Sequence, residues 1–170
     1  NTSIAICGLG YVGFPVALLF ARAGFRVIGI DRSENKAKLI NRGKSPIVGK
    51  EPGLKELIKE VRASDRFSAT TDAAAYKQAQ VIIIAVETPV EENREPAYAA
   101  LKAALESIGQ NMKKGTLVIV ESTVAPGTMD NLVGPILEKE SGCKAGREFY
   151  LANCPERLMP GHLLENIQMK

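Results

Sequence analysis

Short aliphatic runs alternate with longer amphipathic segments along the whole chain. Runs rich in Val, Ile and Leu are typical of strands, and apolar residues spaced three and four apart are typical of helices. The run 81–86 is aliphatic almost throughout, which indicates a strand buried on both faces of a parallel sheet. The predicted strands are residues 3–7, 25–30, 67–71 (a weak edge strand), 81–86, 117–120 and 149–153.

Helices are predicted between these strands, and their ends carry residues that favour helix termini. Ser33, Asp72 and Thr128 are expected to cap helix N-termini, and Gly24 and Gly43 to end two helices. Strands that alternate with helices predict an α/β fold, a doubly wound parallel sheet with helices on both faces. The predicted helices run from residue 13 to about 23, then over 33–42, 52–62, 72–79, 96–112 and 128–141, with a kink at Pro135.

The turn after the first predicted strand has the pattern G-x-G-x-x-G over residues 8–13. Gly8 permits the tight turn, Gly10 leaves room for a pyrophosphate, and Gly13 lets the following helix pack close to the strand. The free N–H groups and the partial positive charge at a helix N-terminus attract phosphates. The pattern in this context predicts a Rossmann-type domain that binds a dinucleotide.

Asp31 ends the second predicted strand, 18 residues after Gly13 and close to the roughly 20 expected in such domains. A carboxylate there accepts hydrogen bonds from the adenosine ribose and repels a 2′-phosphate, which favours NAD over NADP. The adjacent Arg32 leaves a preference for NADP open, since a guanidinium can hold the 2′-phosphate. A methyltransferase that binds an adenosyl sulfonium is the non-redox alternative, although its glycine loop is usually less regular.

Composition excludes several classes of protein. The 170 residues suit one domain, and 45% hydrophobic with 24% charged residues is typical of a soluble globular protein. The net charge of +3 is spread out, and the longest basic run is Lys113–Lys114, so nucleic acid is not an expected partner. One His and three scattered Cys give no metal-site spacing and favour a reducing, cytoplasmic compartment. A membrane span is not expected, because no apolar run approaches about 20 residues.

Polar residues also follow the later predicted strands, at the sheet edge where doubly wound folds bind ligands. Thr88 opens a loop after the fourth strand, and Thr123 follows the fifth. Glu156 and Arg157 follow the last strand, where a carboxylate can act as a general base and a guanidinium can pair with a substrate phosphate. By residue type alone, a surface ion pair explains the last two equally well.

Five motifs, in order, resemble the UDP-glucose/GDP-mannose dehydrogenase family. They are the glycine turn at 8–13, Glu-Pro-Gly-Leu at 51–54, Thr-Pro at 88–89, Ser-Thr and Pro-Gly-Thr within 122–128, and Pro-Glu-Arg at 155–157. The ending at 155–161 is more similar to the N-acetylhexosamine branch, because the UDP-glucose branch usually has Phe where Arg157 stands.

The resemblance implies NAD-dependent oxidation of the C6 alcohol of a UDP-sugar to a carboxylate, in the supply of surface polysaccharides. The expected substrate is UDP-N-acetyl-D-mannosamine, with UDP-glucose and UDP-N-acetylglucosamine as alternatives. Two hydride transfers to two NAD molecules pass through an aldehyde, which a cysteine captures, and a thioester, which water hydrolyses. The family's nucleophilic Cys and catalytic Lys lie in a later domain. Residues 1–170 are therefore expected to be the NAD-binding domain of a protein that forms homo-oligomers. The family's central helix and C-terminal substrate domain are not among these residues, so the chain alone is expected to be inactive.

The resemblance also implies roles for individual residues. Cys154 does not match the family's nucleophile motif and is interpreted as a small residue at a strand end. Cys7 is expected in the core, Cys143 in a polar turn and His162 in a loop. The implied NAD contacts are Gly8, Gly10, Tyr11, Val12, Gly13, Asp31, Lys36, Thr88 and Thr123. The implied catalytic residues are Glu156, as acid/base for water, and Thr123. The implied substrate contacts are Glu156, Arg157 and Leu158.

Two other functions compete with this hypothesis. One is a module that senses NAD and regulates a partner without catalysis, for which an acid/base group at Glu156 would have no use. The other is a β-hydroxyacid-type dehydrogenase with a similar cofactor domain, whose substrate motifs would not include Pro-Glu-Arg.

Overall fold

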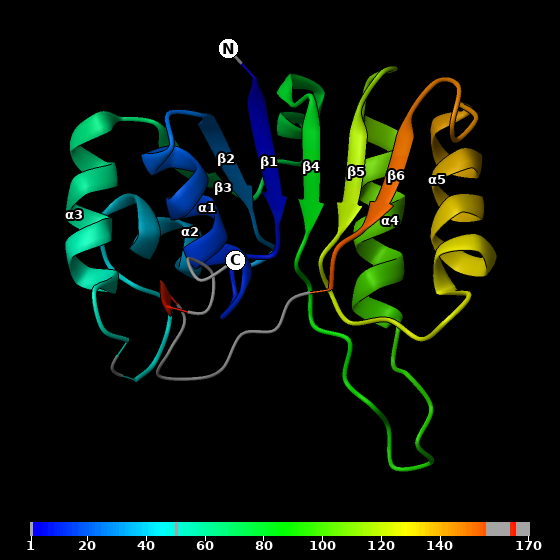
Figure 1. Ribbon diagram of the computed structural model, residues 1–170, viewed down its shortest axis with the longest axis horizontal. Helices are drawn as coiled ribbons and strands as arrows, with labels where there is room; N and C mark the ends of the chain where they lie inside the picture. The colour runs from blue at the N-terminus through cyan, green and yellow to red at the C-terminus, as the bar shows by residue number, and fades with distance from the viewer. Residues whose placement is uncertain (1, 50, 156–163, 166–170) are drawn as a thin grey trace.

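A six-stranded, all-parallel sheet forms the centre of the computed structural model, which describes residues 2–49, 51–155 and 164–165 (Figure 1). The strand order is β3-β2-β1-β4-β5-β6, as in the dinucleotide-binding sheets in which two halves diverge from the centre. The predicted edge position of the third strand is confirmed. The strands are β1 (Ser3–Cys7), β2 (Arg26–Ile30), β3 (Phe67–Thr70), β4 (Val81–Ile84), β5 (Leu117–Val120) and β6 (Tyr150–Asn153).

Helices cover both faces of the sheet, as the alternating pattern predicted (Figure 1). One layer packs mainly against β1, β2 and β3, and the other packs on the opposite face, against β1, β2, β4 and β5. The first layer contains α1 (Gly13–Arg22), α2 (Glu34–Asn41) and α3 (Leu54–Ser64). The second contains the 3₁₀-helix η1 (Ala73–Gln78), α4 (Ala99–Asn111), the π-helix η2 (Met129–Val133) and α5 (Gly134–Ser141).

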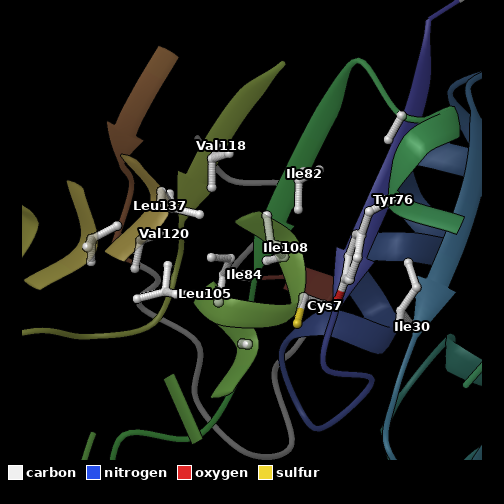
Figure 2. Close-up of a cluster of buried hydrophobic side chains, with 14 of the residues drawn as sticks. Cys7, Ile30, Tyr76, Ile82, Ile84, Leu105, Ile108, Val118, Val120 and Leu137 are labelled. Carbon is white, nitrogen blue, oxygen red and sulfur yellow. The ribbon is translucent and has the colours of Figure 1, made fainter. Parts of the chain in front are cut away.

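Two apolar clusters, one on each face, hold the layers together. In the cluster beneath α4 and α5, side chains of the strands meet those of the helices, as between Ile84 of β4 and Leu105 and Ile108 of α4 (Figure 2). All three of these side chains are fully buried, and burial of each contributes about 1.5–3 kcal/mol. On the other face α1 lies against β1 and packs on α3. The strands are therefore rigid supports for the loops at their carboxyl ends.

Local chemistry explains where most helices begin and end. The Ser33 hydroxyl accepts a hydrogen bond from the Lys36 N–H, and a carboxylate oxygen of Asp72 accepts one from the Ala74 N–H. Gly24 has a φ of +102°, which suits the residue after a helix C-terminus. Two of the three predicted N-caps are thus confirmed.

The segment 128–141 differs from the single capped helix that was predicted. Its first turn is the π-helix η2, closed by a hydrogen bond from the Gly134 N–H to the Met129 carbonyl. Thr128 precedes it but does not cap it; the Thr128 hydroxyl lies 3.1 Å from the Tyr98 hydroxyl instead. Pro135 lies in the first turn of α5, directly after the π-helix, so the change from π-helical to α-helical hydrogen bonding falls beside the proline, which has no N–H to donate.

Smaller differences concern other boundaries. The helices predicted from residues 52 and 96 begin at Leu54 and Ala99, and the segment after Asp72 is a 3₁₀-helix. Cys143, expected in a polar turn, is buried against the α4–α5 layer. Within the described ranges, no helix is long and apolar enough to cross a membrane, and no cluster of three or more His, Cys, Asp or Glu side chains could hold a metal ion.

Candidate cofactor site

A cleft of about 690 Å³ lies at the carboxyl ends of the central strands, where the strand order reverses. Ligands bind at this point in doubly wound sheets, and the volume is within the usual range for small-molecule sites. The structure brings most of the predicted cofactor residues together here. Of those residues, Gly8, Gly10, Tyr11, Val12, Asp31, Lys36, Thr88 and Thr123 line the cleft.

The three glycines of the turn do different work. Gly8 has a φ of +90°, and a Cβ on it would lie 2.8 Å from the Ala85 carbonyl oxygen. A Cβ on Gly13 would lie 1.9 Å from the Gly8 carbonyl oxygen, so Gly13 permits the close packing of α1 rather than lining the cleft. A Cβ on Gly10 would meet nothing within 4 Å, because Gly10 faces the open cleft. This open surface fits the pyrophosphate of a dinucleotide, which must approach the backbone at Gly10.

The N-terminus of α1 points into the same region. The helix begins at Gly13, and its N-cap residue, Val12, has no polar side chain to bond the first N–H groups. Such a terminus combines available donors with the positive end of the helix dipole. The turn and the helix together form an anion site of the kind that holds phosphates.

Asp31 is held firmly at one end of the cleft. Its carboxylate accepts hydrogen bonds from the Leu9 N–H (2.9 Å), the Ser33 N–H (2.9 Å) and the Lys36 ammonium (2.7 Å). Burial alone would raise the pKa of Asp31, but these three donors outweigh it and the pKa lies below its ordinary value. An ionised, oriented carboxylate is what a ribose partner requires.

Two cations flank Asp31 and differ in how they are held. Lys36, in the first turn of α2, reaches back to the Asp31 carboxylate and is half-buried. Arg32 is largely exposed, and its guanidinium lies 3.8 Å from the Glu87 carboxylate on the β4 side of the cleft. The Asp31–Lys36 ion pair is shorter and less exposed than the Arg32–Glu87 pair. The buried charged group at this end of the cleft is therefore the Asp31 carboxylate.

Hydroxyl groups join the ends of β4 and β5 at the other end of the cleft. The Thr88 hydroxyl donates to the Thr123 carbonyl (2.7 Å), and the Ser122 hydroxyl donates to the Val86 carbonyl (2.6 Å). These bonds fix the two loops that carry Thr88 and Thr123 at the cleft wall. Both threonines line the cleft, and the sequence pattern did not indicate that one positions the other.

One face of α4 lines the cleft with small side chains that the sequence analysis missed. The apolar stripe of α4 that faces the core is the stronger pattern, and a second row of small residues lies beside it. These residues are Ala100, Ala103, Ala104 and Ser107, spaced three, one and three apart on one side of the helix. Their small size is what keeps this wall of the cleft open.

A thiol and a phenol lie at the floor of the cleft. Burial raises the pKa of Cys7 to about 11, although its hydrogen bond with Tyr76 acts in the opposite direction. Burial likewise raises the pKa of Tyr76. Both groups therefore stay protonated at neutral pH, and Cys7 is a core thiol as predicted (Figure 2).

The predicted substrate residues Glu156, Arg157 and Leu158, and His162, lie outside the described residues. The chain leads toward them from the carboxyl end of β6, where the Cys154 N–H donates to the Val120 carbonyl (2.9 Å). Cys154 itself is exposed beside this strand end. The described chain thus reaches Pro155 at the same sheet edge as the cleft.

Comparison with known proteins agrees with this geometry. The NAD binding domain of the UDP-glucose/GDP-mannose dehydrogenase family matches residues 2–170. The chain belongs to this family. The domain matched is one that binds NAD, and the cleft at the carboxyl ends of the strands is the candidate site for it.

Relatives cover nearly all of the chain. It is 37% identical over 164 residues to the UDP-N-acetyl-D-mannosamine dehydrogenase of Pyrococcus horikoshii, covering 96% of this chain and 38% of that protein. It is 43% identical over 159 residues to the GDP-mannose 6-dehydrogenase of Pseudomonas putida, covering 91% and 36%. The crystal structure of an NDP-N-acetyl-D-galactosaminuronic acid dehydrogenase from Methanosarcina mazei superposes with a TM-score of 0.93 at 41% identity, covering 98% and 37%. The chain thus spans less than two fifths of the length of each of these three relatives.

Proposed function

We propose that this chain is the NAD-binding part of an enzyme that oxidises the C6 alcohol of a nucleotide sugar to a carboxylate. The observation that carries the proposal is one cleft at the reversal point of the sheet, bordered by the glycine turn, the buried Asp31 carboxylate and the two threonine loops. A match to the NAD binding domain of nucleotide-sugar dehydrogenases over residues 2–170 supports it.

The chain's own residues have distinct tasks in this proposal. Asp31 and Lys36 hold the adenosine ribose, and the backbone at Gly10 with the N-terminus of α1 holds the pyrophosphate. Thr88 and Thr123 set the position of the nicotinamide end. When bound there, NAD accepts the hydride released from the sugar carbon.

The substrate side of the reaction is assigned to the segment after β6. We expect Glu156 to move the proton of the attacking water, and Arg157 and Leu158 to contact the nucleotide sugar. The nucleophilic Cys and catalytic Lys of the family belong to a later domain. The proposed setting is the cytoplasm, in a homo-oligomer of the full-length protein, and the three free cysteines fit a reducing compartment.

UDP-N-acetyl-D-mannosamine is the substrate that we propose first. Arg157 supports it by the likeness of residues 155–161 to the N-acetylhexosamine branch, and so does the name of the Pyrococcus relative. The name of the Methanosarcina relative supports an N-acetylhexosamine but a different one. GDP-mannose is the second candidate, because GDP-mannose 6-dehydrogenases reach 43% identity with this chain.

The deciding experiment measures NADH formation by the complete reading frame. UDP-N-acetyl-D-mannosamine, UDP-N-acetylglucosamine, UDP-glucose and GDP-mannose are offered separately, and the NADH formed per sugar is counted. About two NADH per UDP-N-acetyl-D-mannosamine would establish the four-electron oxidation and the branch. Two NADH per GDP-mannose would keep the reaction and replace the substrate. NAD binding with no oxidation of any of the four sugars would favour another sugar, or the sensing module that regulates a partner.

A further inference from the structure

Tyr11 and Glu51 make a side-chain contact that ties the glycine turn to a distant segment. The Tyr11 hydroxyl donates a hydrogen bond to the Glu51 carboxylate, and the two residues are 40 positions apart in the sequence. Tyr11 directly follows Gly10 and lines the NAD cleft, whereas Glu51 lies outside the cleft, and both side chains are partly buried. The contact therefore connects the wall of the cofactor site to the loop before α3.

Glu51 is itself fixed by the start of α3. Its carbonyl accepts a hydrogen bond from the Leu54 N–H (3.2 Å), and Gly53 adopts a φ of +77° to close this turn. A carboxylate just before a helix N-terminus is favoured by the helix dipole. Leu57 and Val61 of α3 are buried in the same apolar cluster as α1, so the support behind Glu51 is rigid.

The Tyr11 ring is thus held at two points, by its own backbone in the turn and by Glu51 through its hydroxyl. The turn has three glycines and would sample other shapes without such restraints. A turn that is already in its binding shape loses less conformational freedom when a ligand binds.

We propose that Glu51 is a positioning residue for the cofactor, which acts through Tyr11 to hold the glycine turn in the shape that the NAD pyrophosphate requires. The proposal rests on the NAD site described above. It predicts that loss of the Glu51 acceptor lowers the affinity for NAD more than it lowers the affinity for a ligand that lacks the pyrophosphate.

The test compares Glu51→Ala, Glu51→Gln, Tyr11→Phe and the double variant Tyr11→Phe/Glu51→Ala by calorimetric titration of the chain with NAD and with AMP. Because Glu51 acts on NAD only through the shape of the turn, only part of the free energy of its hydrogen bond should appear in binding, and about a three- to tenfold weaker NAD affinity is expected for Glu51→Ala and Tyr11→Phe. The double variant should be no weaker than either single variant, because both remove the same bond. Glu51→Gln keeps an acceptor oxygen and should stay within about twofold of the original chain.

Glu60→Ala is the matched control, since Glu60 is an exposed carboxylate on α3 away from the cleft. It should leave NAD affinity unchanged, and AMP affinity should change less than NAD affinity in every Glu51 or Tyr11 variant. Additive losses in the double variant, equal losses for NAD and AMP, or a Glu51→Ala variant with unaltered NAD affinity would each overturn the proposal. Failure of the unsubstituted chain to bind NAD would instead reject the cofactor site itself.

Discussion

Asp31 performs a structural and a ligand-binding task with one carboxylate. Its three donors come from the glycine turn, from the loop after β2 and from α2, so it joins these segments before any ligand arrives. The same ionised group is placed to receive the ribose hydroxyls. Ionised groups accept stronger hydrogen bonds than neutral ones, which makes this residue the main determinant at the adenosine end.

Asp31→Ala is expected to weaken NAD binding about ten- to a hundredfold, because hydrogen bonds to a charged group contribute roughly 1.5–3 kcal/mol. NADP should lose less, since Arg32 and Lys36 remain and no carboxylate would repel the 2′-phosphate. Titration with both dinucleotides measures the two effects. Glu34→Ala, an exposed carboxylate on the same helix as Lys36, serves as the control. Unchanged NAD affinity in Asp31→Ala would reject Asp31 as the ribose partner.

The lowered pKa of Asp31 also makes stability depend on pH. Folding favours the ionised form, so the contribution of Asp31 is complete above its ordinary pKa of 3.8 and is lost as the pH falls through the lower folded value. The difference in unfolding free energy between the original chain and Asp31→Asn should therefore shrink as the pH is lowered from 7 through 4 toward 3. Urea unfolding at each pH measures it, and a constant difference would contradict the pKa shift.

At the scale of elements, two glycines of the turn serve different purposes: Gly13 is needed for folding and Gly10 for binding. Gly13→Ala places a methyl group against the Gly8 carbonyl and should cost about 3 kcal/mol or more of stability. Gly10→Ala meets no neighbour, and its φ is outside the left-handed region, so stability should change by less than about 1 kcal/mol. The methyl group of Gly10→Ala would nevertheless occupy the space that the pyrophosphate needs, and NAD affinity should fall at least about tenfold. Thermal unfolding and NAD titration of both variants test this; a Gly10→Ala chain that binds NAD normally would contradict it.

The central strands β4 and β5 were predictable because each is a wholly aliphatic run, as expected of strands that a parallel sheet buries. The edge strands β3 and β6 carry polar residues and gave a weaker signal. Two N-caps were predictable because they depend on contacts within three residues. The missing cap at Thr128 was not predictable, since its hydroxyl meets that of Tyr98, 30 residues away in the chain. No local pattern indicated the π-helix at Met129–Val133. The bond from Thr88 to the Thr123 carbonyl and the bond from Tyr11 to Glu51 are likewise tertiary, and no local pattern encodes them.

At the scale of the whole molecule, the glycine turn and Asp31 predicted the reversal point of the sheet as the ligand site, because strand ends in such a fold meet at one edge. The predicted residues at the first, second, fourth and fifth strand ends line the same cleft, except Gly13, which packs α1 against the turn. The roles of Glu156 and Arg157 stay predictions, because both lie outside the described residues.

In the proposed enzyme, this chain binds NAD and the rest of the protein supplies the nucleophile and the catalytic lysine. The chain holds the residues proposed to bind NAD, but it spans about 38% of the length of the Pyrococcus relative, and the family's nucleophile and catalytic lysine are expected in the remainder. The chain alone should therefore bind NAD and form no NADH with any of the four nucleotide sugars. Titration with NAD and absorbance of NADH under identical conditions separate binding from turnover, and the complete reading frame is the positive control. Because binding needs only the cleft, whereas turnover needs the substrate domain with its catalytic lysine and its nucleophilic cysteine, the two activities should separate completely. Clear turnover by the chain alone would mean that residues of this domain, with the exposed Cys154 as the first to replace by Ser, supply the nucleophile.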